Sequence, residues 1–198
     1  MGQKIKDKRG KTKEARACLA KIKNLAFHES KNLIIQQSNN PTLKYTRLTK
    51  EQFESLNKEF ITFLATQSIT GDEWTTIKEK QPEVAEQELD IFSDLVWEGV
   101  LKQATYLENI SAQQLFLFEV GASEMSLIVV KVTNEAHDIT SAEGYKWLQQ
   151  NFASDEVEFF TSSKAFSEDK NADIFGLIKQ GAAITKGELY RFFEKFVD

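Results

Sequence analysis

The stretch PEVAEQELDIFSDLVWEGVLKQATYLENI, from Pro82 to Ile110, decides the fold that the rest of the chain must accommodate. Its apolar residues recur at spacings of three and four, which places them on one face of a helix. They are Leu89, Phe92, Val96, Val100, Ala104 and Leu107, and Ile91, Leu95 and Leu101 widen the stripe. Pro82 suits a first helical turn, where its missing N–H costs nothing. The stretch therefore predicts one long central helix that packs against more than one neighbour.

Two shorter helices are predicted before the central one. Each opens with a capping box, in which a threonine and an acidic or amide side chain three residues later satisfy each other's backbone N–H. The first helix extends to about Thr66, and the second stops before Pro82, because the residue ahead of a proline disfavours helical backbone. The two boxes pair Thr49 with Gln52 and Thr70 with Glu73.

The second half of the chain alternates strands and helices. Leu115–Val120 and Met125–Val132 predict a hairpin, and Val157–Thr161 predicts a third strand, joined to the hairpin by a right-handed helical crossover. Capping boxes at Thr140/Glu143 and Thr185/Glu188 predict two helices, and a helix between them ends at Gly181. We therefore expect an α+β fold, with an N-terminal helical subdomain packed on a small mixed sheet of about three strands and with C-terminal helices.

Charge divides the chain near residue 44. Residues 1–44 hold 11 Lys and Arg against 3 Asp and Glu, whereas residues 45–198 hold 14 against 27. We interpret residues 1–43 as a basic, largely disordered extension and linker, and residues 44–198 as a single α+β domain. This basic extension, called the arm below, is predicted to bind a polyanion such as RNA or a ribosome-like particle, because Lys and Arg bind phosphates without a base-reading motif. Its docking on the protein's own acidic helix is the alternative. The candidate polyanion-binding residues are Lys4, Lys6, Lys8, Arg9, Lys11, Lys13, Arg16, Lys21 and Lys23.

Four carboxylates follow one another at steps of four residues on the predicted central helix. Like charges at this spacing destabilise a helix by a few tenths of a kcal/mol, about 0.2–0.5 per pair. A di-metal site in a helix bundle would need Glu-x-x-His pairs, which the sequence lacks. The row therefore predicts either an acidic docking face for a basic partner or a solvated helix face. Its residues are Glu86, Asp90, Asp94 and Glu98.

Other candidate chemistry is sparse. His137, Asp138 and Thr140 are interpreted as a turn and a helix cap, and Thr161–Lys164 as a polar loop without the glycines of a P-loop. With no nucleophile–base pair, metal-ligand spacing or glycine-rich loop, the sequence predicts a non-enzymatic binding or adaptor protein with a protein partner, and no cofactor or metal. The first alternative is an RNA- or ribosome-associated factor.

A small hydrolase or transferase that uses Asp138 and Glu143 is the second alternative. A deep pocket with two acids and the Thr161–Lys164 loop would favour this enzyme, and an exposed apolar patch would favour the adaptor.

Location is predicted from three features. The longest apolar runs are four residues, far below the ~20 of a membrane span. The basic N-terminus has no apolar core of a secretory signal. Cys18 is the single cysteine, which excludes an internal disulfide. We expect a cytoplasmic protein without a membrane partner.

The run LTKEQFESLNKEFITF, Leu48–Phe63, resembles an uncharacterised family of small bacterial proteins, as do FLATQSITGDEW and PEVAEQELDIFSDLVWEGVL after it. The run ITKGELYRFFEKF, Ile184–Phe196, is similar to the C-terminus of that family. The resemblance covers roughly residues 44–198, and members of the family commonly begin near the equivalent of Lys44-Tyr45. It implies no activity for particular residues here.

Overall fold

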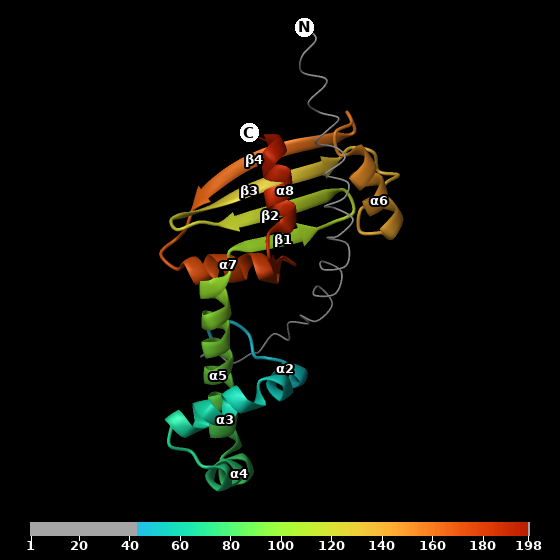
Figure 1. Ribbon diagram of the computed structural model, residues 1–198. Helices are drawn as coiled ribbons and strands as arrows, with labels where there is room; N and C mark the ends of the chain where they lie inside the picture. The colour runs from blue at the N-terminus through green and yellow to red at the C-terminus, as the bar shows by residue number, and fades with distance from the viewer. Residues whose placement is uncertain (1–42, 198) are drawn as a thin grey trace. The chain divides into compact units, whose positions relative to one another are not determined.

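The computed structural model describes residues 43–197, which form seven helices and one five-stranded sheet (Figure 1). The predicted α+β class is confirmed. The described chain divides into two compact units, a helical unit at residues 43–103 and a sheet unit at residues 104–197. That residues 44–198 form a single domain, and that the helices pack on the sheet, remain predictions.

The helical unit contains α2 (Lys50–Ser55), α3 (Asn57–Thr66), α4 (Gly71–Lys80) and α5 (Pro82–Gln103). Both predicted capping boxes at its start are present, at Thr49 with Gln52 and at Thr70 with Glu73. The helix predicted after the first box is in fact two helices, because the backbone leaves helical geometry at Leu56 (φ −103°, ψ 22°).

An aromatic cluster holds these helices together. The Phe92 ring of α5 lies 5.8 Å from the ring of Phe53, 5.1 Å from that of Phe60 and 5.4 Å from that of Phe63. Trp74 of α4 meets Phe60 edge-on at 5.4 Å. Aromatic pairs at these separations stabilise a core beyond the area that they bury. Phe92 therefore acts as the centre on which α2 and α3 converge, and α4 joins the cluster through Phe60.

The central helix ends earlier than the sequence predicts. It stops at Gln103, and Tyr106–Ile110 form strand β1 instead. Leu107 continues the helical spacing by coincidence, and a short apolar segment cannot be assigned to helix or strand by its period alone. In β1 the same residue is fully buried, with Phe118 and Ile184 opposite it on the two flanking strands. Long-range strand pairing therefore decides the structure of these five residues.

The sheet is larger and more regular than predicted. Its order is β4-β3-β2-β1-β5, and every neighbouring pair is antiparallel, so the prediction of a mixed sheet of about three strands is wrong. The predicted crossover is also wrong, because β4 returns antiparallel to β3 with Val132 opposite Val157. The strands are β1, β2 (Gln114–Val120), β3 (Glu124–Val132), β4 (Val157–Ala165) and β5 (Ala183–Thr185).

Helices cover the two faces of this sheet unequally. On one face, α8 (Glu188–Val197) lies across the strands, and α6 (Ala142–Asn151) adds Leu148 to the same core (Figure 1). The strand residues buried there are Leu115, Leu117, Ile128, Val130, Val132 and Val157. On the other face, α7 (Lys170–Lys179) faces Phe118, Met125 and Leu127. The residues of β3 and β4 on that second face are half-buried or exposed, and Phe160 is 51% exposed.

The two later capping boxes are not formed as predicted. Helix α6 is capped by Ser141, whose hydroxyl accepts from the Gly144 N–H at 3.0 Å. Helix α8 begins at Glu188, so Thr185 lies in β5 and not at a cap. Between β5 and α8, Gly187 has φ 71° and packs on the Tyr106 ring, where a Cβ has no room. Gly181, which follows α7 with φ 97°, ends that helix as predicted.

Candidate functional site

The acidic row of α5 is occupied by a segment of the same chain. The backbone N–H groups of Lys44 and Tyr45 donate to Asp94 at 2.8 and 2.9 Å. The Lys44 ammonium and the Tyr45 hydroxyl both donate to Glu98 at 2.6 Å. The pKa of Tyr45 is raised, mainly because the side chain is partly buried and secondly because of its bond to Glu98. The segment thus lies along the helix, held by charge-assisted bonds.

The other two carboxylates of the row bind Arg47. Its Nε donates to Asp90 Oδ1 at 2.6 Å, and its Nη1 donates to Glu86. The bond to Asp90 is the main cause of a raised pKa for Arg47, ahead of the bond to Glu86. Asp90 is only 3% exposed, so its charge is paired where solvent cannot reach it.

Neutral bonds complete the attachment of this segment. The Trp97 indole N–H donates to the Thr46 carbonyl at 3.0 Å, and the Leu48 N–H donates to Ser93 Oγ at 3.2 Å. The row Glu86, Asp90, Asp94 and Glu98 therefore has a structural function in fixing residues 44–48. Its use as a docking face for another molecule remains a prediction. The basic arm, with its candidate residues from Lys4 to Lys23, lies outside the described residues.

The turn at Asp138 is a local structure. Its carboxylate accepts from the Thr140 hydroxyl at 2.6 Å and from the Thr140 N–H at 2.9 Å, and these bonds lower the pKa of Asp138. Next to it the His137 ring stacks on Trp147 with centroids 3.8 Å apart. Glu143 lies in the first turn of α6 and is exposed. These contacts agree with the interpretation as a turn, although the helix cap is Ser141.

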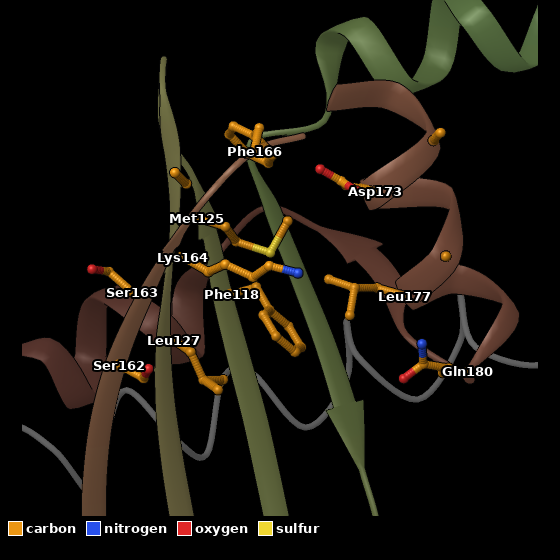
Figure 2. A pocket seen from close by; sticks show the side chains of 13 residues that line it. Phe118, Met125, Leu127, Ser162, Ser163, Lys164, Phe166, Asp173, Leu177 and Gln180 are labelled. Carbon is orange, nitrogen blue, oxygen red and sulfur yellow. The ribbon is translucent and has the colours of Figure 1, made fainter. Parts of the chain in front are cut away.

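A groove of about 470 Å³ lies between α7 and the less covered face of the sheet (Figure 2). Phe118 of β2 and Met125 and Leu127 of β3 form its floor, and Leu177 of α7 forms the opposite wall. Lys164 extends from β4 across Met125 toward α7, as Figure 2 shows. The volume is within the range of about 300–1,000 Å³ that is typical of binding sites. This groove is the candidate functional site.

Two polar contacts fix the end of the groove where α7 begins. Asp173 accepts from the Ser167 N–H at 2.7 Å, which ties the start of α7 to the segment that leaves β4. Lys170 donates to the Gly121 carbonyl at 2.6 Å and thereby holds α7 against the turn between β2 and β3. Hydrogen bonds at the start of α7 therefore attach the apolar wall of the groove to the sheet.

The sequence did not predict this groove. The segment Thr161–Lys164, predicted to be a loop, is the end of strand β4. Pairing with β3 places Ser162 opposite Leu127 and Lys164 opposite Met125, on the side of the groove. Nothing local in the sequence indicates that α7 lies over this face, because its position depends on contacts far along the chain.

Among residues 43–197, no cluster of three or more His, Cys, Asp or Glu side chains is placed to hold a metal ion. None of the helices described there has both the length and the apolar composition that crossing a membrane requires.

Comparison with known proteins places most of the chain in one family. Residues 43–198 match a family of unknown function, DUF6495. The match confirms the resemblance and its boundary near Lys44. No curated protein and no solved structure matches the chain.

Proposed function

The chain belongs to the DUF6495 family, whose function is unknown, and we propose that it is a non-enzymatic binding protein that acts through contacts with another protein. The observation that carries this proposal is the apolar groove between α7 and the sheet. Its floor, which lies on a half-buried part of the sheet, and its wall on α7 are both apolar. We further propose that it acts in the bacterial cytoplasm, from the family resemblance and the sequence features given above.

The apolar surface continues beyond the groove. Strand register sets Phe118 opposite Leu127, and it aligns Phe116, Val129 and Phe160 as a row across β2, β3 and β4. None of these side chains is fully buried. Contiguous apolar surface that is partly exposed, as here, is typical of protein interaction sites. We propose that the partner is a protein segment that inserts bulky apolar side chains into the groove and covers this row.

The groove supports a binding protein better than the enzyme alternative. The enzyme would need at least two acids, or an acid and a nucleophile, converging on one pocket. Asp173 is the one acidic residue among those that line the groove, and it already accepts from the Ser167 N–H. Asp138 and Glu143 are not among the lining residues. The geometry therefore favours binding through the apolar floor.

A capture experiment with three forms of the full chain tests the proposal. Wild type, Leu127→Glu and Leu95→Glu are used as baits in an extract of the native cell, after circular dichroism has shown that all three are folded. Leu127 is in the floor of the groove, whereas Leu95 is an equally apolar residue of α5 with 58% exposure. We expect wild type and Leu95→Glu to retain one partner that Leu127→Glu loses. Equal capture by Leu127→Glu would overturn the proposal.

A further inference from the structure

Strand β4 forms one edge of the sheet, and no strand among residues 43–197 pairs with its outer side. It is nine residues long, and most of it is exposed. Such an edge presents unpaired N–H and C=O groups and is a template for another strand. Natural proteins commonly protect long edges with proline or a bulge, but β4 has no proline and pairs with β3 in unbroken register.

Two hydrogen bonds show which backbone groups of β4 point outward. Phe166 N donates to Ser123 O at 3.1 Å, and Glu156 O accepts from Thr133 N at 2.9 Å, so even-numbered residues face β3. In an antiparallel ladder the direction alternates from one residue to the next. The odd-numbered residues of β4 therefore point their N–H and C=O groups outward, among them Phe159, Thr161 and Ser163.

We infer that the outer edge of β4 pairs antiparallel with β4 of a second copy of this chain, about a two-fold axis at Thr161. In this register Thr161 faces its own symmetry mate, and Phe159 faces Ser163 of the second copy. Each of these pairs joins outward-pointing residues, as the hydrogen bonding requires. An identical patch on both copies is what a two-fold interface needs.

Charge complementarity selects this register and a second copy as the occupant. Glu158 of each copy lies opposite Lys164 of the other, so the pair occurs twice. Both side chains project from the same sheet face, where Glu158 also lies 3.4 Å from Lys131 of β3. A shift of two residues in either direction breaks both pairs. A parallel, in-register arrangement would set each charge against its own kind.

This inference goes beyond the proposed function and does not depend on it. The groove floor is formed by Phe118, Met125 and Leu127 on β2 and β3, and although the Lys164 side chain also lines the groove, the outer backbone edge of β4 does not form its floor. If the protein proved to be monomeric, the expected results of the capture experiment with the groove variant would stay the same. A dimer that captures no partner would overturn the proposed function alone.

Sedimentation velocity on the full chain tests the pairing. Glu158→Lys makes both facing residues basic, and Lys164→Glu makes both acidic. We expect wild type to dimerise and each variant alone to dimerise at least tenfold more weakly. An equimolar mixture of the two variants should regain a 1:1 heterodimer, because every facing pair is then opposite in sign. A monomeric wild type, or a dimer that neither substitution weakens, would overturn the inference.

A cross-link fixes the register. In a Cys18→Ser background, Thr161→Cys brings two cysteines to facing positions about 5.5 Å apart at Cα, a separation that a disulfide spans. Ser163→Cys is the matched control, because its symmetry mate lies four residues away along the strand. We expect an oxidised dimer from Thr161→Cys and not from Ser163→Cys. Equal cross-linking at both positions would contradict this register.

Discussion

Arg47 Nε lies 2.6 Å from Asp90 Oδ1, and this bond joins the segment ahead of α2 to a carboxylate on α5 that is 3% exposed. A charge at that depth is stable only with a partner, because the cost of its desolvation must be offset. Arg47 bonds to Glu86 as well, so one guanidinium binds two of the four carboxylates in the row. The pair is therefore central to the helical unit.

Removal of Arg47 should destabilise the protein. Arg47→Met leaves Asp90 buried without its cation, and we expect a loss of about 1–3 kcal/mol in the free energy of unfolding. The loss is below the ~3–5 kcal/mol for a fully buried pair, because the Arg47 side chain is 25% exposed. Urea denaturation measures the change. Gln87→Ala, an exposed change on the same helix, should stay within about 0.5 kcal/mol of wild type. A loss of about 0.5 kcal/mol or less in the free energy of unfolding of Arg47→Met would show that Asp90 does not need this partner.

Gly187→Ala should be costly for backbone and packing reasons together. The position has φ 71°, and a Cβ there would meet the Tyr106 ring. We expect a loss of at least about 1 kcal/mol, as for other residues held in this backbone region. Gly71→Ala is the matched control, because a Cβ at Gly71 meets nothing within 4 Å. Thermal unfolding should separate the two variants, and equal midpoints would contradict the geometry.

Glu108 should make stability depend on pH. Burial raises the pKa of this carboxyl, a bond from Thr185 Oγ1 at 3.1 Å lowers it, and the nearby Glu188 raises it. Since the folded-state pKa lies above the unfolded one, the folded state holds the proton more tightly. Stability should therefore fall as pH rises from about 4.5 through the raised folded-state pKa.

Glu108→Gln should remove that decline, because an amide does not titrate. Unfolding free energies of the two forms, measured from pH 4 to pH 8, should diverge in favour of the variant as pH rises. Thr185→Val should extend the decline to higher pH, because the hydroxyl that lowers the pKa is gone. Parallel profiles for wild type and Glu108→Gln would show that Glu108 does not cause the decline of stability with pH.

The basic arm has its own test. Residues 1–31 hold 10 Lys and Arg against 3 Asp and Glu, and we expect them to bind RNA independently of sequence. If six of these charges met phosphates, the slope of log affinity against log salt would be near −5 on a duplex, by the rule of about −0.9 per contact. Titration of full-length and arm-less protein at two salt concentrations measures it. Equal, salt-insensitive binding by both forms would end this hypothesis.

Short-range features of the fold could be predicted from the sequence. The boxes at Thr49 and Thr70 involve residues three positions apart, and the α-helical periods around them agree with the caps. Features that depend on distant partners could not be predicted. The local period predicts helix for Tyr106–Ile110, because the strands that pair with this segment, β2 and β5, are elsewhere in the chain and β5 is only three residues long.

The candidate site divides in the same way. The four-residue spacing indicates the acidic row, but its partner Arg47 lies 43 positions from Asp90 along the chain. The groove requires both the antiparallel register of β2, β3 and β4 and the position of α7. Neither follows from local propensity, because strand pairing and helix docking depend on tertiary contacts.

Photo-cross-linking from inside the groove tests the central claim most directly. A benzophenone amino acid replaces Leu177 of α7, or, as the control, Ile61 of α3, which is 58% exposed. In the native cell, irradiation should join the Leu177 probe to one partner protein, and Leu127→Glu in the same chain should abolish the adduct. The Ile61 probe should not give that adduct. No adduct from Leu177, or the same adduct from Ile61, would contradict a partner bound in the groove.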